Sequence, residues 1–291
     1  MASARLNRAI ESVPNFSSGR DAQLLEGLAQ AVQGYAGVRL LDRSADRDHN
    51  RSVFTIAGAP EVVVEAVFAA VRVAVSRIDL NLHDGVHPRI GAADVIPFVP
   101  LANITMEECV EIARKFGERL WRELHVPVFF YERAGTRKLE EVRRAANEGA
   151  KPNVGVGRHP TAGACAVGAR DFLIAWNIWL KSEDLALARH IARSIRFSSG
   201  GLPGVKALGL PLASEGIVQV SINSTDFRST PLHVIFNAVK ALAQYAGVET
   251  LGSELIGMVP KEALTLSAGH ELRWLNFSLE RVLDPETWET E

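Results

Sequence analysis

Apolar residues in the second half of the chain alternate between the spacing of strands and the spacing of helices. Strand-like runs occupy Phe172–Ile178, Val205–Leu210, Ile217–Ile222 and Val248–Ile256. Two segments with apolar residues three or four positions apart lie between them, a helix capped by Ser182 that runs through Arg196 and a helix from Pro231 to Ala246. The order β-α-β-β-α-β predicts a split-βαβ, or ferredoxin-like, subdomain. After it, helical spacing returns over Pro260–Leu283.

The first half shows the same order and then extends it. Its predicted elements are a strand at Ala9–Val13, a helix at Asp21–Tyr35, strands at Val38–Leu41 and Val53–Ala57, a helix at Pro60–Ile78 and a strand at Asp94–Val99. The extension consists of a helix that a Thr105–Glu108 capping box opens, a strand at Val126–Tyr131 and a charged surface helix at Arg137–Asn147. Lys151–Gly168 is rich in glycine and proline and is predicted to link the two halves.

These patterns predict an α/β (α+β) protein of two ferredoxin-like βαββαβ subdomains that face each other across a ligand cleft. The predicted boundaries are 1–170 for the N-terminal subdomain and 171–291 for the C-terminal subdomain with its helical tail.

Composition narrows the class of protein. Hydrophobic residues make up 47% and charged residues 23% of the 291 residues, which is typical of a globular protein with a substantial core. A net charge of -2 argues against a general nucleic-acid binder. The apolar runs are too short to span a bilayer, and the N-terminus lacks the apolar core of a signal peptide. Without a secretory signal, Cys109 and Cys165 are expected to be buried thiols and the protein to be cytoplasmic.

The segment Ile78–Pro100 carries the clearest candidate chemistry. His83 and His87 lie on a predicted loop, followed by Arg89 and Asp94. A loop histidine is a candidate proton carrier because its pKa lies near neutrality. The residues alone leave open whether His87 carries protons or simply donates to a carbonyl in a tight turn, and they favour His83 as a hydrogen-bonded loop residue. The glycine and proline around the pair disfavour a helix that would place both on one metal, so no metal site is predicted.

Several short motifs occur in a fixed order along the chain. They are Ser12-Val-Pro-Asn-Phe-Ser-Ser-Gly-Arg20, Asp48-His-Asn-Arg-Ser-Val53, His87-Pro-Arg-Ile-Gly-Ala-Ala-Asp94, Gly168-Ala-Arg170, Phe172-Leu-Ile-Ala175, Val205-Lys-Ala-Leu-Gly209, Gln219-Val-Ser221 with Asn223, and Ser253-Glu-Leu-Ile-Gly257. In these motifs, from about Ile10 to Ala263, the chain resembles the glutamate formimidoyltransferases, the formiminotransferase part of formimidoyltransferase-cyclodeaminase.

The resemblance implies an activity and a co-substrate. It implies two α/β subdomains with tetrahydrofolate in a tunnel between them, and transfer of a formimino group from N-formimidoyl-L-glutamate to N5 of tetrahydrofolate in histidine degradation. It places the catalytic general acid/base on His87, and it implies a homodimer. Because only a short helical tail follows Ala263, a separate cyclodeaminase is expected to use the product. Two alternatives stay open: formyl transfer between 5-formyltetrahydrofolate and glutamate, and a non-catalytic folate-binding module.

The resemblance also implies binding residues. The folate-contacting loop falls on Gly155, Val156, Gly157, Arg158, His159, Pro160, Thr161, Ala162 and Gly163. The candidate substrate-binding residues are Asn50, Arg51, Arg89, Asp94 and Lys206.

Each of these residues also has a structural interpretation. Asn50 and Arg51 are as well suited to pinning a loop, Asp94 to starting a strand, and Lys206 to protecting an edge strand. Asp94 or Asp46 is a candidate for favouring the cationic amidine, and Trp176 and Trp179 suit packing better than pterin stacking.

Overall fold

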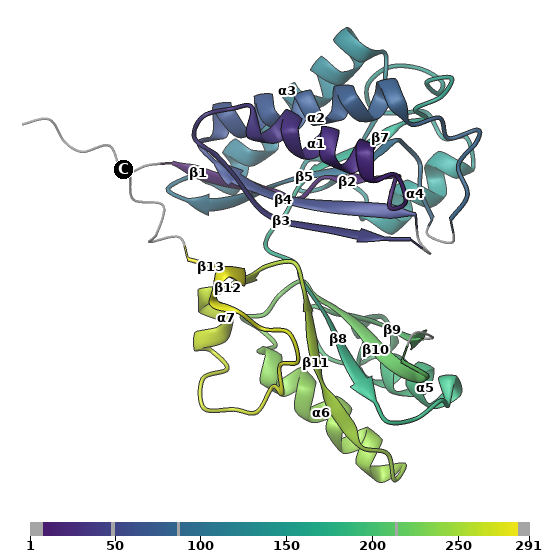
Figure 1. The fold of residues 1–291 in the computed structure, drawn as a ribbon, viewed down its shortest axis with the longest axis vertical. Coiled ribbons are helices and arrows are strands. Elements are labelled where there is room, and N and C mark those ends of the chain that lie inside the picture. Colours follow the sequence, from purple (N-terminus) through teal and green to yellow (C-terminus); the bar gives the residue numbers. More distant parts are fainter. Residues whose placement is uncertain (1–7, 48–49, 86–87, 213–214, 285–291) are drawn as a thin grey trace, which may run out of the picture. The chain divides into compact units, whose positions relative to one another are not determined.

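The computed structural model describes residues 8–47, 50–85, 88–212 and 215–284, which form two compact units (Figure 1). Unit 1 ends at Arg170, and unit 2 spans Asp171–Asp284. Each unit has its own sheet and its own apolar core.

The sheet of unit 1 has the strand order β3-β4-β1/β2-β5-β7-β6. Its strands are β1 (Ala9–Ser12), β2 (Asn15–Phe16), β3 (Val38–Asp46), β4 (Arg51–Gly58), β5 (Ala93–Ala102), β6 (Val128–Glu132) and β7 (Cys165–Ala169). β1 and β2 both pair with β4 and β5, so they act as one strand interrupted at Val13 and Pro14. The part from β1 to β5 is the ferredoxin-like core, and β7 and β6 extend it in parallel.

Helices cover the two faces of this sheet unequally. Helices α1 (Ala22–Gln33), α2 (Pro60–Arg77) and α3 (Met106–Leu124) pack on one face, around a core that includes Leu28, Val67 and Phe116. Helix α4 (Leu139–Asn147) packs on the opposite face, where Val142 and Ala146 contact a smaller cluster with Phe129 and Tyr131. α4 therefore covers β6 and β7 on the face opposite α1, α2 and α3.

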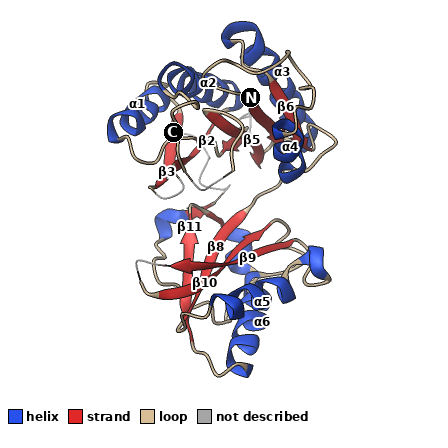
Figure 2. Cartoon of the chain, turned by 90° about the vertical axis from the view of Figure 1, so that its right-hand side faces the viewer, coloured by secondary structure: helices blue, strands red, loops and turns tan. Residues whose placement is uncertain are grey.

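Unit 2 is a ferredoxin-like layer pair (Figure 2). It contains β8 (Ile174–Leu180), α5 (Leu185–Ile195), a 3-10 turn (Phe197–Ser199), β9 (Val205–Leu212), β10 (Ile217–Ser224), α6 (Leu232–Tyr245) and β11 (Thr250–Ile256). The sheet is antiparallel in the order β11-β8-β10-β9. Alternate side chains such as Trp176 and Val220 pack against α5 and α6, and the other face of the sheet carries neither of these helices. Short elements close the unit: β12 (Val259–Pro260), α7 (Lys261–Thr265), a 3-10 turn (Leu279–Arg281) and β13 (Val282–Leu283).

The predicted fold class is confirmed, since both units contain the β-α-β-β-α-β order. The predicted capping box of α3 is also confirmed: the Glu108 backbone N–H donates to Thr105 Oγ1 at 3.2 Å, and the Thr105 N–H donates to Glu108 Oε2 at 2.8 Å. Cys109 and Cys165 are free, buried thiols as expected.

Three details of the prediction are wrong. Lys151–Gly168 does not simply link the halves, because it leads into β7, a buried strand between β5 and β6 whose small residues give no strong strand signal. Pro260–Leu283 contains only the short helix α7, and Leu266, Leu275 and Leu279 in this segment are exposed instead of forming a buried stripe. The N-cap of α5 is Asp184, which accepts from the Ala186 and Leu187 N–H groups, while Ser182 accepts from Asp184.

None of the helices within the described ranges is both long enough and apolar enough to cross a membrane.

Candidate active site

Val86 and the predicted catalytic residue His87 lie outside the described residues, but the loop on both sides of them is described. This loop lies beside the Gly155–Gly163 segment. The Leu80 N–H donates to the Thr161 carbonyl at 2.8 Å, the Ala92 N–H to the Ala162 carbonyl at 2.9 Å, and the Ala164 N–H to the Ile90 carbonyl at 2.8 Å. The two segments that the resemblance assigns to catalysis and to folate binding are therefore hydrogen-bonded neighbours.

Glycine is needed where these segments meet. Gly163 has φ +71°, and a Cβ at this position would lie 2.3 Å from the Ile90 carbonyl oxygen. Any larger residue would push the two segments apart.

Asn50, His83 and Arg89 brace the described part of the histidine loop. Asn50 Oδ1 accepts from the Gly19 N–H at 2.9 Å, and its Nδ2 donates to the Asp84 carbonyl at 2.9 Å. Arg89 donates to His83 Nδ1 and, at 2.7 Å, to the Gly85 carbonyl. Because guanidinium only donates, His83 Nδ1 accepts, and its Nε2–H donates to the Asn50 carbonyl at 3.1 Å. His83 is thus a neutral, hydrogen-bonded loop residue in this arrangement.

Asp94 anchors the start of β5. Its carboxylate is buried, with Oδ1 accepting from the Ile90 N–H at 2.7 Å and Oδ2 paired with Arg143 Nη2 at 2.5 Å. Arg143 lies on α4, four residues after Leu139 and one after Val142, and therefore on the inner side of that helix. Sequence reasoning missed Arg143 because it treated the segment as a charged surface helix; its spacing from the apolar stripe was the available signal.

Arg51 adds a second guanidinium to this cluster. Burial and the like charge of Arg143 lower the pKa of Arg51 to about 10, whereas Asp94 and Asp46 oppose this shift. Burial also lowers the pKa of Arg89, opposed by Asp94 and reinforced by Arg20. Three arginines therefore share the field of one buried carboxylate. The excess of positive charge suits an anionic ligand.

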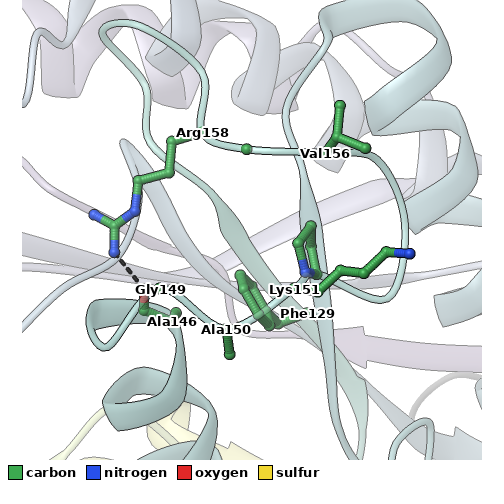
Figure 3. A pocket seen from close by; sticks show the side chains of 9 residues that line it. Phe129, Ala146, Gly149, Ala150, Lys151, Val156 and Arg158 are labelled. Atoms are coloured by element: carbon green, nitrogen blue, oxygen red, sulfur yellow. Dashed lines mark hydrogen bonds between the residues drawn. The ribbon is translucent and has the colours of Figure 1, made fainter.

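The Gly155–Gly163 segment borders a hollow of about 520 Å³ (Figure 3). Phe129, Pro152 and Val156 supply apolar surface, and Lys151 and Arg158 supply positive charge. Arg158 donates to the Ala146 carbonyl at 2.5 Å, which ties the segment to the end of α4.

His159 supports the turn that follows this hollow. Its Nδ1 accepts from the Ala162 N–H at 3.0 Å and from the Thr161 N–H at 3.3 Å. Burial and the nearby His125 lower the pKa of His159, so the neutral ring that can accept these bonds is favoured. Pro160 and Gly157 are exposed within the same segment.

Lys206 belongs to unit 2, whereas the other predicted site residues belong to unit 1. It lies on β9, the edge strand of the unit 2 sheet, directly opposite Asn223 of β10. Within the described part of the chain, no group of three or more histidine, cysteine or acidic side chains is arranged to hold a metal ion.

Comparisons with known proteins cover nearly the whole chain. Residues 9–170 match the family model described as the formiminotransferase domain, N-terminal subdomain, and residues 175–279 match the model described as the formiminotransferase domain. A glutamate formimidoyltransferase of Streptococcus pyogenes serotype M1 is 41% identical over 290 residues, which cover 95% of this chain and 97% of that protein. A glutamate formimidoyltransferase of Thermoplasma acidophilum is 38% identical, with coverages of 94% and 96%.

Longer proteins are also similar to this chain. A formimidoyltransferase-cyclodeaminase of Gallus gallus is 41% identical over 277 residues, which cover 88% of this chain and 51% of that protein. Both family models and the full-length relatives agree: the chain belongs to the formiminotransferase family.

Proposed function

We propose that this enzyme transfers the formimino group from N-formimidoyl-L-glutamate to N5 of tetrahydrofolate, with His87 as general acid/base. The observation that carries the proposal is the match to a glutamate formimidoyltransferase over 95% of this chain and 97% of the relative, since such a match spans both units. The amine of tetrahydrofolate supplies the nucleophile, and glutamate is the leaving group.

The proton transfers suit a single histidine. As the C–N bond to the accepting amine forms, that nitrogen must lose a proton; as the C–N bond to glutamate breaks, the departing nitrogen must gain one. One imidazole can do both in turn, which is worth roughly 100- to 10,000-fold in rate. Pro88 follows His87 in the sequence, and a residue before proline favours extended geometry, which would limit the conformations of this loop. His83, already bonded to Arg89 and Asn50, is less suited to this role.

The arginines beside Asp94 suit the donor substrate. N-Formimidoyl-L-glutamate carries two carboxylates, and guanidinium groups bind carboxylates in pairs of parallel hydrogen bonds. Arg51 and Arg89 supply such groups near the histidine loop, with Asn50 and Asp94 holding the backbone around them. On this proposal Asp94 acts by orienting Arg143, and Lys206 of unit 2 binds a carboxylate.

The hollow beside the Gly155–Gly163 segment suits part of tetrahydrofolate. An apolar floor with Phe129, flanked by Lys151 and Arg158, matches a molecule that joins an aromatic ring to a glutamate. The segment from Gly155 to Gly163 therefore remains our proposed folate contact.

The resemblance to the family also suggests the compartment, the oligomeric state and the partners of the enzyme. We expect a cytoplasmic homodimer whose substrates are the small molecules N-formimidoyl-L-glutamate and tetrahydrofolate, with no nucleic-acid or membrane partner and no metal. The Gallus gallus relative is named for both activities, so we expect a cyclodeaminase, fused or separate, to use the product.

Turnover of the purified protein tests the proposal. Wild type should convert tetrahydrofolate with N-formimidoyl-L-glutamate, followed by absorbance of the folate product, and 5-formyltetrahydrofolate with glutamate should be a poorer pair. The variant His87→Ala should lose about 100-fold or more in kcat and keep its affinity for tetrahydrofolate. His190→Ala, on the exposed side of α5, is the matched control and should keep full activity. Turnover of His87→Ala within threefold of wild type would contradict the catalytic role, and absence of transfer by wild type from both donors would contradict the function.

A further inference from the structure

Within the described structure, each of the two main sheets ends in two edge strands, and three of these four edges are protected. An edge strand presents unpaired backbone N–H and C=O groups, so proteins usually cover such an edge or place charges on it. β6 is covered by the segment 153–154, where the Val154 carbonyl accepts from the Val128 N–H at 2.9 Å. β11 is covered by the segment 273–276, which donates to and accepts from the Ser253 backbone at 2.8 Å. β3 carries four charged residues along its edge: Arg39, Asp42, Arg43 and Asp46.

β9 is the fourth edge, and it has neither kind of protection over most of its length. Among the described residues it pairs with β10 alone. Its one charged residue, Lys206, lies near the start of the strand, and the remaining seven residues are apolar. Leu208 lies in the middle of the strand with 59% of its surface exposed. β9 is therefore an apolar edge, which is the kind of edge that another strand can extend.

The backbone groups that β9 offers outward are those of Ala207 and Gly209. In an antiparallel pair, successive residues alternate between facing the neighbouring strand and facing away from it. The Val218 N–H donates to the Ser182 carbonyl at 2.8 Å, on the β8 side, so Val218 and its neighbour Pro211 do not bond to each other. By the same alternation, the N–H and C=O groups of Ala207 and Gly209 point away from β10. Pro211 has no N–H and ends this row of donors.

We propose that β9 pairs with β9 of a second copy of this chain, antiparallel about a two-fold axis at Leu208. Ala207 of each copy then exchanges two backbone hydrogen bonds with Gly209 of the other copy, four bonds in all. The two four-stranded sheets become one continuous sheet. The proposal gives a surface to the homodimer expected from the family, and it does not depend on the reaction proposed above.

The edge is complementary to itself in this orientation. Ala207 and Gly209 are equally distant from Leu208, so a two-fold axis at Leu208 matches each outward donor with an outward acceptor. The axis places Leu208 against Leu208 of the second copy, where two exposed apolar side chains cover each other. It places Lys206 opposite Leu210 of the second copy, so the two lysines are separated by four residues along the strands, about 14 Å.

A second copy offers no better edge for this pairing. Its β6 and β11 are covered by chain, and its β3 carries four charges, so β9 is the apolar edge that remains. A parallel pair in register would place Lys206 directly against Lys206, which the antiparallel pair avoids. Pairing at the edge also leaves the sheet face that carries Lys206 uncovered.

Cysteine cross-linking tests the position of the two-fold axis. Leu208→Cys would place two thiols at a pair whose Cα atoms are about 4.5 Å apart, which a disulfide can span. Under mild oxidation this variant should form a disulfide-linked dimer at least about tenfold faster than the matched control Leu210→Cys, whose two thiols would lie about 14 Å apart. The native thiols Cys109 and Cys165 are buried, so the background reaction should be slow.

A charge at the same position tests the pairing itself. Sedimentation should give wild type the mass of two chains. Leu208→Lys sets two ammonium groups against each other and should raise the dimer dissociation constant at least about 100-fold. Leu279→Lys, at a leucine of unit 2 that is 83% exposed, is the matched control and should stay dimeric. The circular dichroism of both variants should equal that of wild type, since both leucines are largely exposed.

The outcomes separate this inference from the proposed reaction. A monomeric wild type, a folded Leu208→Lys that remains a dimer, or cross-linking of Leu208→Cys no faster than that of Leu210→Cys would overturn the β9 pairing. Formimino transfer by wild type in any of these cases would leave the reaction standing. A dimer that behaves as expected in both experiments, but transfers no one-carbon group, would support the β9 pairing and overturn the reaction.

Discussion

Glu11 is an acidic residue in a position that ordinarily holds an apolar one. It lies in the middle of β1, is only 4% exposed, and is flanked by both β4 and β5. Burial raises the pKa of Glu11 to about 7, against the opposing attraction of the Arg170 guanidinium. The neighbouring residue Ile10 fills the apolar core, so the alternation of β1 directs Glu11 to the opposite face of the sheet.

The raised pKa makes the stability of the fold depend on pH. The unfolded chain ionises Glu11 near 4.5 and the folded chain near 7, so the folded state binds the proton more tightly. The stabilisation by the protonated group is complete below pH 4.5 and is lost as the pH rises to about 7, a total of roughly 3 kcal/mol. We expect Glu11→Gln to remove this loss, so that its unfolding free energy from urea titrations changes less between pH 5 and pH 8 than that of wild type. Glu118→Gln, on the exposed side of α3, should keep the wild-type pH dependence; a Glu11→Gln profile parallel to wild type would contradict the prediction.

At the residue scale, the sequence was enough to choose candidate residues but not to predict which side chains would contact them. The likeness of its motifs to a family predicts Arg51, Arg89 and Asp94 as substrate-binding residues, a role that stays a prediction. In the structure, Asp94 acts electrostatically on both arginines. The sequence did not predict that Arg143 would complete the cluster, because which residue of α4 meets Asp94 depends on how that helix packs on the sheet. Strand alternation did separate Trp176, which lies in the core, from Trp179, which faces away from α5 and α6, as the interpretation of these two residues as core and surface packing requires.

Among the elements, the pair Asp94–Arg143 joins the start of β5 to α4. The Asp94 side chain is 2% exposed and that of Arg143 15%, so this ion pair is largely removed from water. Removing one member of a buried pair leaves the other charge without compensation and typically costs about 3 to 5 kcal/mol. Here the remaining charge would also face the guanidinium of Arg51.

Asp94→Asn should therefore lower the unfolding free energy by about 3 kcal/mol in urea titrations, although the amide oxygen can still accept from the Ile90 N–H. Combining it with Arg143→Met should restore part of this loss, since the double variant no longer buries an unpaired guanidinium. Glu65→Gln, which breaks the more exposed pair with Arg119, is the comparison and should cost at most about 1 kcal/mol. Strictly additive effects of Asp94→Asn and Arg143→Met would show that the two side chains are not coupled.

The sequence predicted best those elements in which regularly spaced apolar positions are filled by large side chains. Helices α2 and α6 and the strands of unit 2 combine regular apolar spacing with large side chains, and their existence was predicted. β7 was missed because Cys165, Ala166 and Gly168 are small and carry little strand propensity. Gly168 is required by its neighbour, as a Cβ there would lie 2.5 Å from the Tyr131 ring. β7 is therefore a strand because of its packing between β5 and β6, and its own residues carry little strand signal.

For the molecule as a whole, the boundary between the apolar cores coincides with the boundary between the two units at Arg170 and Asp171. The main core of unit 1 and the smaller cluster under α4 contain only residues up to Ala169, and the core of unit 2 begins at Phe172. Because each sheet is covered by helices of its own unit, each core is formed by residues of that unit. Local unfolding free energies are therefore expected to differ between the units.

Hydrogen exchange measured on matched core variants should reveal this division. Ile191→Ala removes buried side-chain volume from α5, which typically costs about 2 to 5 kcal/mol, and should accelerate amide exchange in β8 and β10 by about 30-fold or more. The amides of β4 and β5 should exchange at wild-type rates. Val67→Ala on α2 is the mirror experiment and should affect β4 and β5 while sparing β8 and β10. If either variant accelerated amide exchange equally in both sheets, the chain would unfold as one cooperative unit. The two cores, although built from different residues, would then share one free energy of unfolding.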